Sequence, residues 1–439
     1  MKQTTFLILV LLLSALTVKA QSIYTLHDLL EIGLEQNYSV RIVRNNQQVS
    51  DNNTTLANAG FLPTVNFSGG YAGNLNDTRT TSVDGTIVRE NGVFNQNANA
   101  GLNANWYLFD GFRIQANYRR LQELQALGEI NTRVTIEDFI ASLAARYYNL
   151  IQQKIRLENL AYAMSLSAER LRIADVRKDI GSGSRLNLLQ AQVDYNADSS
   201  RYVNQLTSVR ESMIRLNELL ANPNVEEYIN IADSLIPINY NLRIEELEEN
   251  MMRVNASLLA AERNIYVAEQ DLEVVKSRNY PYVSMSTGYG YTWNGYGSGN
   301  TSYRGNLGLN AGITIGMTIF NGNRSREQAN ARITIENQRL RQQQLEESLK
   351  ADLMTFWQAY LNNLEVYRME RENVIVAREN YAIAMERYYD IGNLSGYEMR
   401  EAQRSLLDAE ERLLTSVYNT KMCEISLMQI SGRILVYIE

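Results

Sequence analysis

The chain has 439 residues, of which 45% are hydrophobic, and it contains one Cys, one His and four Pro with a formal net charge of −7. A single Cys excludes an intramolecular disulfide framework, a single His excludes His-pair metal sites, and the negative charge argues against binding to a nucleic-acid backbone. We therefore expect no metal site, no cofactor, no nucleic-acid partner and no enzymatic activity.

The first 20 residues have the pattern of a secretory signal peptide. Lys2 gives a positive start, residues 6–13 are an unbroken apolar segment, and Val18 and Ala20 are the small residues that a signal peptidase reads. An uncleaved anchor is the alternative reading. No apolar stretch long enough for a spanning helix follows, so further membrane contact must come from strands or from a surface helix.

The chain then repeats itself. The segment Asp179–Gly181 recurs as Asp390–Gly392, Phe109–Gly111 recurs as Phe320–Gly322, and Pro63 corresponds to Pro281. Duplicated motifs in the same order indicate two copies of one structural unit. We predict a signal peptide over 1–20, a first structural repeat over 21–221, a connector over 222–242, a second structural repeat over 243–431 and a C-terminal tail over 432–439.

Each repeat has the same predicted layout, with a helix, a pair of strands and a long helical hairpin. Pro63 in the first repeat and Pro281 in the second stand where a predicted helix gives way to a strand, as expected for a residue that breaks helix interiors. The predicted ranges are helix 28–59, strand pair 63–109 and hairpin 113–221 in the first repeat, and helix 243–279, strand pair 281–320 and hairpin 324–430 in the second.

The predicted strands alternate between apolar and small polar residues. Leu102, Ala104 and Trp106 alternate with Asn103 and Asn105, and the corresponding segment of the second repeat behaves alike. Segments of about 10 to 13 residues suffice for a tilted strand to cross a hydrocarbon core. A soluble sandwich with one wet face is the alternative, but the signal peptide and the lack of a second apolar sheet favour a membrane barrel.

Four such strands cannot close into a barrel, because the smallest bacterial barrels have about 8 strands. A bilayer tolerates no open sheet edge, so several chains must combine their strands. Two chains would give eight strands and three would give twelve. This count requires an oligomer and leaves its order open.

The helical hairpins are too long for a globule. The range 113–180 would be a helix about 100 Å long. Apolar residues recur in steps of three and four, as at Ile140, Leu143, Tyr147 and Leu150, which is the periodicity of a coiled coil. Helices of this length joined to membrane strands must project far from the bilayer.

Taken together, these features resemble the TolC-type outer-membrane efflux proteins. The resemblance rests on the Phe109–Gly111 and Phe320–Gly322 steps, the duplicated layout and the hairpin tips. It implies a mainly α chain with membrane β-structure: a trimeric 12-stranded β-barrel, four strands per chain, continuing into a long periplasmic α-helical barrel, with the connector in an equatorial belt. The tip pattern is carried by Gly181, Ser184, Asn187, Ala191 and Gln192, and by Gly392, Ser395, Glu398, Ala402 and Gln403.

The resemblance also implies a function and partners. Such proteins lie in the Gram-negative outer membrane, contact its lipid, and form homotrimeric exit ducts of tripartite efflux or type I secretion systems. A periplasmic adaptor connects them to an inner-membrane RND or ABC pump, and the duct conducts its cargo passively. The tips expected to meet the adaptor are Gly181, Ser182, Gly183 and Ser184 in the first hairpin, and Gly392, Asn393, Leu394 and Ser395 in the second.

The same family pattern places the periplasmic entrance at Glu398, Glu401, Tyr389 and Asn187. Three chains would present six carboxylates near one axis, which repels anions, attracts cations and raises the pKa values of the ring. The alternative is that Glu398 and Glu401 lie on a solvated helix face. Asn187 replaces the acid usual in the family, so the first hairpin lacks that charge.

A function from a different class also fits the pattern: a non-conducting trimeric coiled-coil scaffold or adhesin anchored by a β-barrel. A duct needs small polar residues towards its lumen, and the Asn, Gly, Ser and Thr faces of the strands fit that need. A stalk would instead pack apolar residues towards its axis and would lack the acids of the second hairpin.

Overall fold

The computed structural model describes residues 23–391 and 393–438. The predicted signal peptide over 1–20 and the tip residue Gly392 lie outside the described residues. The chain divides into two compact units. Of the described residues, the helical unit comprises 23–45, Ile130–Leu259, 344–391 and 393–438, and the sheet unit comprises Asn46–Glu129 and Ala260–Gln343.

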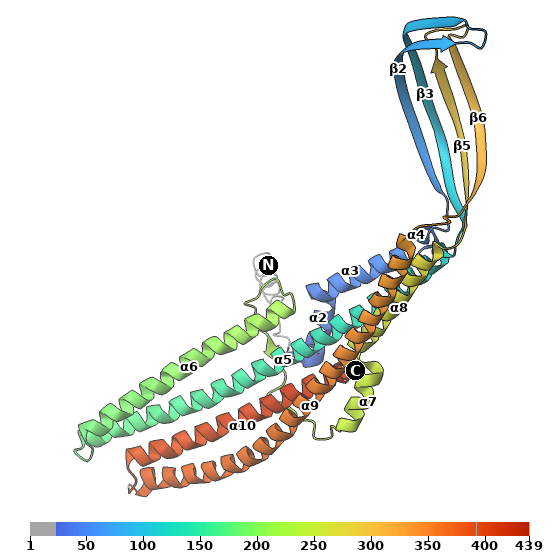
Figure 1. Cartoon of the computed structure of the whole chain (residues 1–439). Coiled ribbons are helices and arrows are strands. Elements are labelled where there is room, and N and C mark those ends of the chain that lie inside the picture. Colours follow the sequence, from blue (N-terminus) through green and yellow to red (C-terminus); the bar gives the residue numbers. More distant parts are fainter. Residues whose placement is uncertain (1–22, 392, 439) are drawn as a thin grey trace, which may run out of the picture. The chain divides into compact units, whose positions relative to one another are not determined.

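The sheet unit contains one four-stranded antiparallel sheet, in the order β2-β3-β5-β6 (Figure 1). Its strands have 14 to 24 residues, which is longer than the predicted alternating segments of about 10 to 13 residues. A bulge between Asn76 and Thr78 interrupts the β2–β3 pairing. The strands are β2 (Thr64–Thr81), β3 (Ile87–Asp110), β5 (Tyr282–Gly295) and β6 (Tyr303–Gly316).

The register gives the sheet one apolar face and one polar face. Residues directly opposite each other in antiparallel strands share a face. One row across the sheet is Phe67, Leu102, Tyr289 and Leu309, and the next is Ser68, Gly101, Gly290 and Gly308. Along the apolar face, Phe67 is 74% exposed and Leu309 is 73% exposed. The apolar face is therefore not covered by the described part of this chain.

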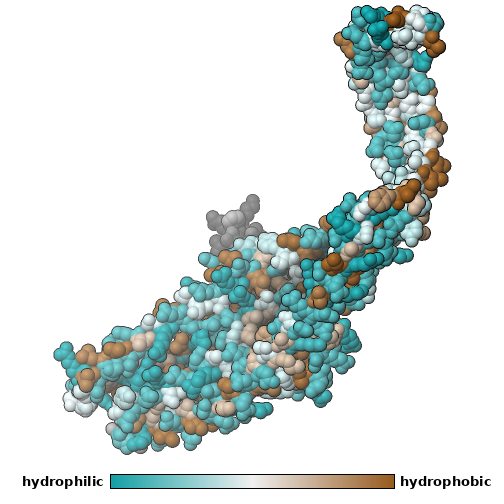
Figure 2. All heavy atoms as spheres, viewed as in Figure 1, coloured by the Kyte–Doolittle hydropathy of each residue, from teal (hydrophilic) through white to brown (hydrophobic). Residues whose placement is uncertain are grey.

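Figure 2 shows the sheet unit from one side, with hydrophilic and intermediate residues along the strands and hydrophobic residues mainly near the margins and ends. Among the described residues, no helix combines the length and the hydropathy needed to cross a membrane.

The strand-to-helix step after β3 depends on Gly111. Its φ is +68°, and an added Cβ would lie 2.3 Å from the carbonyl oxygen of Ser277. Glycine fits both requirements because it has no side chain. Asp110, the last residue of β3, then stabilises the start of the next helix, because its carboxylate accepts a hydrogen bond from the Ile114 amide at 3.1 Å and pairs with Arg113 at 2.8 Å.

The helices follow the predicted order but are divided more finely. The range 28–59 forms three helices, and the range 243–279 forms two. The helices are α2 (Leu26–Gln36), α3 (Tyr38–Asn53), α4 (Leu56–Ala59), α5 (Arg113–Asp179), α6 (Arg185–Leu219), α7 (Ile244–Val254), α8 (Ala256–Ser277), α9 (Asn323–Glu386) and α10 (Gly396–Ile430), with a π-helix at Arg387–Ile391 and a 3-10 helix at Ile434–Tyr437. A two-residue parallel pair joins β1 (Ile23–Tyr24) to β4 (Asn230–Ile231).

Two corresponding asparagines cause the breaks in the helical unit. The side-chain oxygen of Asn37 accepts from the Val40 amide at 3.1 Å, and that of Asn255 accepts from the Leu258 amide at 3.0 Å, so each caps a new helix. Their side-chain nitrogens donate to the carbonyl oxygens of Leu219 and Ile430, each at 2.8 Å. Each break therefore fastens a short helix to the end of a hairpin.

The hairpins pack through the apolar positions that the coiled-coil periodicity marked. Ile140, Leu143, Tyr147 and Leu150 are fully buried in the main core of the helical unit. Tyr147 also donates a 2.7 Å hydrogen bond to Asp233 of the connector. A second cluster fills the second hairpin near its tip, with Tyr381, Tyr388, Met399, Ala402 and Leu406 among its buried members.

Candidate functional site: the hairpin tips and the seam between the hairpins

The first tip is a tight turn between α5 and α6. The carbonyl oxygen of Arg177 accepts hydrogen bonds from the amides of Ser182 and Gly183, at 2.9 and 2.8 Å. Ser184 then caps α6, because its hydroxyl accepts from the Asn187 amide at 3.2 Å. Gly181, Ser182 and Ser184 are exposed, so this predicted tip presents small and hydroxyl groups to solvent.

The second tip follows the π-helix at Arg387–Ile391. The side-chain oxygen of Asn393 accepts from Arg387 at 3.3 Å, and its amide donates to the Arg387 carbonyl at 3.2 Å. Leu394 packs against the buried cluster of the second hairpin, and Ser395 caps α10. Leu394 therefore anchors this tip, while Asn393 and Ser395 remain exposed.

Glu398 has a definite local role as part of a capping box. Its carboxylate accepts from the amide and hydroxyl of Ser395, at 2.9 and 2.7 Å. These hydrogen bonds lower the pKa of Glu398. A glutamate at this position therefore stabilises the start of α10 within a single chain. The expectation that an acidic ring raises the pKa concerns an assembly of chains and stays a prediction.

The other predicted entrance residues lie on both hairpins. Glu401 is exposed one turn beyond Glu398, so the two carboxylates share a helix face. Tyr389 is half-buried, with its ring 5.1 Å from that of Tyr388, and burial raises its pKa. Asn187 is exposed in the first turn of α6. The structure thus places Glu398 and Glu401 together and Asn187 on the other hairpin.

Sequence reasoning missed a buried polar seam between the two hairpins. Asp198 of α6 is 1% exposed and accepts from the Arg400 guanidinium of α10 at 2.6 and 2.9 Å. Ser167 of α5 donates to the same carboxylate. Burial works to raise the pKa of Asp198, but hydrogen bonds from Arg400 and Ser167 bring it below its ordinary value. The seam therefore holds an ionised carboxylate out of water.

Further contacts extend this seam along the helices in both directions. Arg170 of α5 pairs with Asp194 of α6 at 2.5 Å, and Gln403 of α10 donates to the Ala163 carbonyl at 3.2 Å. Nearer the tips, the Arg177 guanidinium lies 4.8 Å from the ring centroid of Tyr388 and donates to its carbonyl at 3.1 Å. The Gln403 and Arg177 contacts connect the α5–α6 hairpin with the α9–α10 hairpin, whereas the Arg170–Asp194 pair joins α5 to α6 within the first hairpin.

A signal for the seam was present in the sequence. Ser167, Asp198 and Gln403 are polar residues that stand four, seven and three positions from the apolar residues Ala163, Ala191 and Leu406 of the same helices. Arg400 lies between the two glutamates assigned to the entrance. Polar groups at buried positions need partners. That rule predicts that these polar residues belong to a hydrogen-bonded network, but it does not identify the partner of each one.

The polar face of the sheet is the second candidate feature. A shallow depression of about 310 Å³ lies on it, lined by Asn99, Asn103, Thr292, Asn306 and Asn310 among others. Asn103 donates to Ser68 at 2.9 Å, and Asn97 donates to Asn294 at 2.6 Å. Small residues and amides make a wettable, uncharged surface in this region. Within residues 23–391 and 393–438, no group of three or more His, Cys, Asp or Glu residues is arranged to hold a metal ion.

A family model matches most of the chain. The model described as "Outer membrane efflux protein" covers residues 29–222 and 249–433. Among curated proteins, the outer membrane protein TolC of Vibrio cholerae serotype O1 is 21% identical over 392 residues, which cover 86% of this chain and 84% of that protein.

Solved structures show the same fold. A membrane protein from Pseudomonas aeruginosa superposes with a TM-score of 0.76 at 15% identity, covering 94% of each chain. The outer membrane protein VceC from Vibrio cholerae superposes with a TM-score of 0.75 at 16% identity, covering 93% of this chain and 96% of that one. The chain therefore belongs to the outer membrane efflux protein family, whose members are channels, and its place is the Gram-negative outer membrane, with a large part in the periplasm.

Proposed function

We propose that three copies of this chain form the outer-membrane exit duct of a tripartite efflux or type I secretion system, which conducts small molecules or proteins passively. The observation that carries this proposal is the sheet, which has one exposed apolar face, one polar face and two unpaired edges. Such a sheet fits a barrel wall that faces lipid outside and water inside.

The two edge strands of the sheet need partner strands from further copies of the chain. Among the described strands, β2 and β6 stand at the margins of the sheet, and each has one side without a partner. Unpaired backbone groups cost several kcal/mol each in a bilayer, so the margins must pair. Pairing β2 of one copy with β6 of the next closes a ring, and three copies of a four-stranded sheet supply twelve strands.

Exposed apolar stripes on the helices support the same head-to-tail contact. On α6, the stripe contains Leu186, Leu189, Val193, Val203 and Leu206, and on α9 it contains Met354, Leu361, Met369, Val376 and Ile383. Both stripes follow steps near the heptad spacing of a coiled coil. We assign the α6 stripe of one copy to the α9 stripe of its neighbour, which continues the ring through the periplasmic helices.

The hairpin tips are the proposed docking points for a periplasmic adaptor, and through it for an inner-membrane RND or ABC pump. These tips present exposed small, amide and hydroxyl groups at Gly181, Ser182, Ser184, Asn393 and Ser395. The alternative assembly is a non-conducting scaffold or adhesin stalk. The uncharged polar face of the sheet favours the duct, because a stalk needs an apolar interior.

Conductance in planar bilayers tests the duct and its entrance together. We expect small, cation-preferring currents from the purified protein. Replacing both acids, Glu398→Gln with Glu401→Gln, should reduce the cation preference or enlarge the currents. Glu245→Gln with Glu249→Gln, an exposed pair on α7, is the matched control and should change neither.

Three results would each contradict one part of the proposal. The absence of any current from correctly assembled protein would favour the stalk. Currents unaffected by the Glu398 and Glu401 double substitution would remove the acidic entrance while leaving the duct. A stable, folded monomer after detergent extraction would remove the shared barrel.

A further inference from the structure

A cavity of about 890 Å³ lies in the helical unit, apart from the tips, the seam and the sheet. Its walls come from α5, α9, α10 and the connector segment 232–240. We call it the connector pocket. Its volume falls within the roughly 300–1,000 Å³ typical of small-molecule sites. Because α5 belongs to one hairpin and α9 and α10 to the other, a molecule bound here would contact both.

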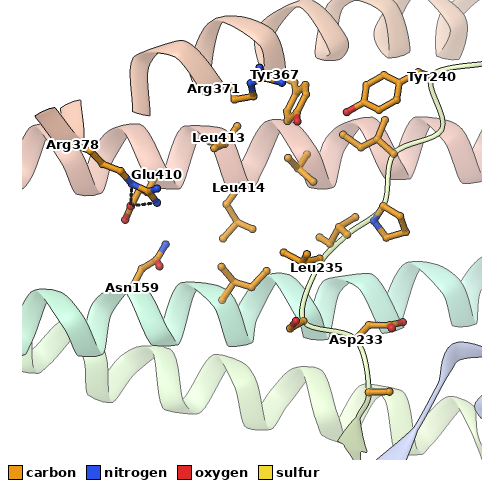
Figure 3. Close-up of a pocket in the computed structure, with 17 residues that line it drawn as sticks. Asn159, Asp233, Leu235, Tyr240, Tyr367, Arg371, Arg378, Glu410, Leu413 and Leu414 are labelled. Carbon is orange, nitrogen blue, oxygen red and sulfur yellow. Dashed lines mark hydrogen bonds and ion pairs between the residues drawn. The ribbon is translucent and has the colours of Figure 1, made fainter. Parts of the chain in front are cut away.

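The middle of the connector pocket is apolar. Leu413 and Leu414 come from α10, Ile155 comes from α5, and Leu235 and Ile236 come from the connector. Figure 3 shows Leu235, Leu413 and Leu414 grouped in this middle part. Leu235 is 76% exposed, so the connector holds a large apolar side chain at the mouth of the pocket. Covering these side chains would release water from apolar surface, which favours a ligand with an apolar body.

One rim of the pocket carries groups that suit an anion. Tyr240, Tyr367 and Arg371 lie together along it (Figure 3). The rings of Tyr240 and Tyr367 are 6.4 Å apart. A hydrogen bond to Tyr367 raises the pKa of Tyr240. A phenol can both donate and accept a hydrogen bond, so the pair still offers a donor. A guanidinium beside phenolic hydroxyls matches a carboxylate, which accepts several hydrogen bonds.

The other charges of the pocket are already engaged. Arg378 donates to Glu410 at 2.9 and 3.2 Å, and Asp233 accepts from Tyr147 at 2.7 Å. Within the described part of the chain, Arg371 is the charged lining residue without a hydrogen bond or an ion pair. The pocket therefore has one available cationic group next to an apolar floor.

The pocket stays open in the proposed assembly. Val376 belongs to the α9 stripe that we assign to a neighbouring copy, and it lies five positions after Arg371. At about 100° per residue, the two side chains are about 140° apart around the helix. The contact between copies and the pocket therefore use different sides of α9.

We propose that the connector pocket binds a small amphipathic carboxylate, with its apolar body on Leu235, Leu413 and Leu414 and its carboxylate at Arg371. The lining of this site includes neither the entrance acids nor the polar face of the sheet. The ligand would bridge the two hairpins and hold them together.

Isothermal titration of the full mature protein in lipid nanodiscs tests the proposal, with 2-naphthoate as the anionic probe and 2-naphthylmethylammonium as its cationic counterpart. Empty nanodiscs give the background from the lipid. We expect one 2-naphthoate site per chain and at least tenfold weaker binding of the ammonium probe. Arg371→Gln should weaken 2-naphthoate binding at least tenfold, and Leu235→Glu should do the same by placing a negative charge at the mouth.

The matched control is Arg368→Gln, because Arg368 is also on α9 but pairs with Glu365 at 3.4 Å and does not line the pocket. It should leave binding unchanged. Arg371 and Leu235 are exposed, so their variants should fold, and unchanged circular dichroism would verify this. Three results would overturn the proposal: no heat above the background at millimolar probe, equal binding of the two probes, or unchanged binding in Arg371→Gln. Conductance measured on the same samples reports on the duct separately.

Discussion

Replacing Arg400 with leucine should open the seam between the hairpins. The change removes both guanidinium hydrogen bonds to Asp198, at 2.6 and 2.9 Å, while that carboxylate stays buried. Breaking a buried ion pair by removing one partner costs about 3–5 kcal/mol. Ser167 still donates and Arg201 lies 3.7 Å away, so we expect the lower end of this range.

Hydrogen–deuterium exchange of the full protein measures this loss locally. A cost of about 3 kcal/mol corresponds to about 100-fold faster exchange for amides that exchange only when the seam opens. These amides should lie in peptides around Ser167 and Asp198. Arg404→Leu is the matched control, because Arg404 lies one turn further along α10 and pairs with Asp408 at 3.6 Å on the exposed surface. Exposed pairs contribute about 0–1 kcal/mol, so this variant should exchange nearly like the wild type.

The double variant Asp198→Leu with Arg400→Leu should be milder than Arg400→Leu alone, because no charge is left buried. Equal exchange in Arg400→Leu and Arg404→Leu would refute the assigned strength of the seam. So would a double variant that is more damaged than the single one.

The seam should also weaken in acid. The folded pKa of Asp198 is below its ordinary value of 3.8, so its contribution to stability is complete above that value. The contribution is lost as the pH falls through the lower, folded pKa. Exchange around Asp198 should therefore accelerate below about pH 3.8 in the wild type, relative to Asp198→Leu with Arg400→Leu. An unchanged ratio across that pH range would contradict the ionised state assigned to Asp198.

Three further predictions concern single side chains. Ser395→Ala removes the α10 cap and should cost about 1 kcal/mol, seen as faster exchange in the first turn of α10 while the α6 terminus keeps its protection. Gly290→Ala should reduce the yield of assembled protein, because the added Cβ would lie 2.8 Å from a β3 carbonyl oxygen and cost about 1–3 kcal/mol in strain. Gly308→Ala, in the same row, places its Cβ in open space and should assemble normally. Tyr147→Phe should lower stability by about 1–2 kcal/mol, because Asp233 loses its 2.7 Å donor, and a melting temperature equal to that of the wild type would contradict this.

The local features of this protein follow from the order of its residues. Alternation along β3, from Leu102 to Asn105, specifies two faces because successive side chains of a strand point to opposite sides. Steps of three and four, as from Ile140 to Tyr147, specify the buried stripe of α5. These features depend on residues a few positions apart, so the residue order alone reveals them.

Some boundaries were also local but were not recognised. Asn37 and Asn255 divide ranges that periodicity predicts as continuous helices, because each side chain caps the following helix and also binds a distant carbonyl. Glu398 is a similar case, since the Ser395 cap engages its carboxylate whatever its role at an entrance. Capping chemistry can be read from sequence when the cap residues are checked at every candidate break.

Which distant residues meet depends on the packing of the folded chain. The pairing of β3 with β5 joins the two halves of the chain into one sheet, and its register brings Leu102 opposite Tyr289. Asp198 and Arg400 are 202 positions apart, and the connector pocket takes its walls from α5, the connector, α9 and α10. Periodicity states that a side chain is buried or exposed, but it does not name its partner, because that choice depends on how whole helices and strands pack against one another.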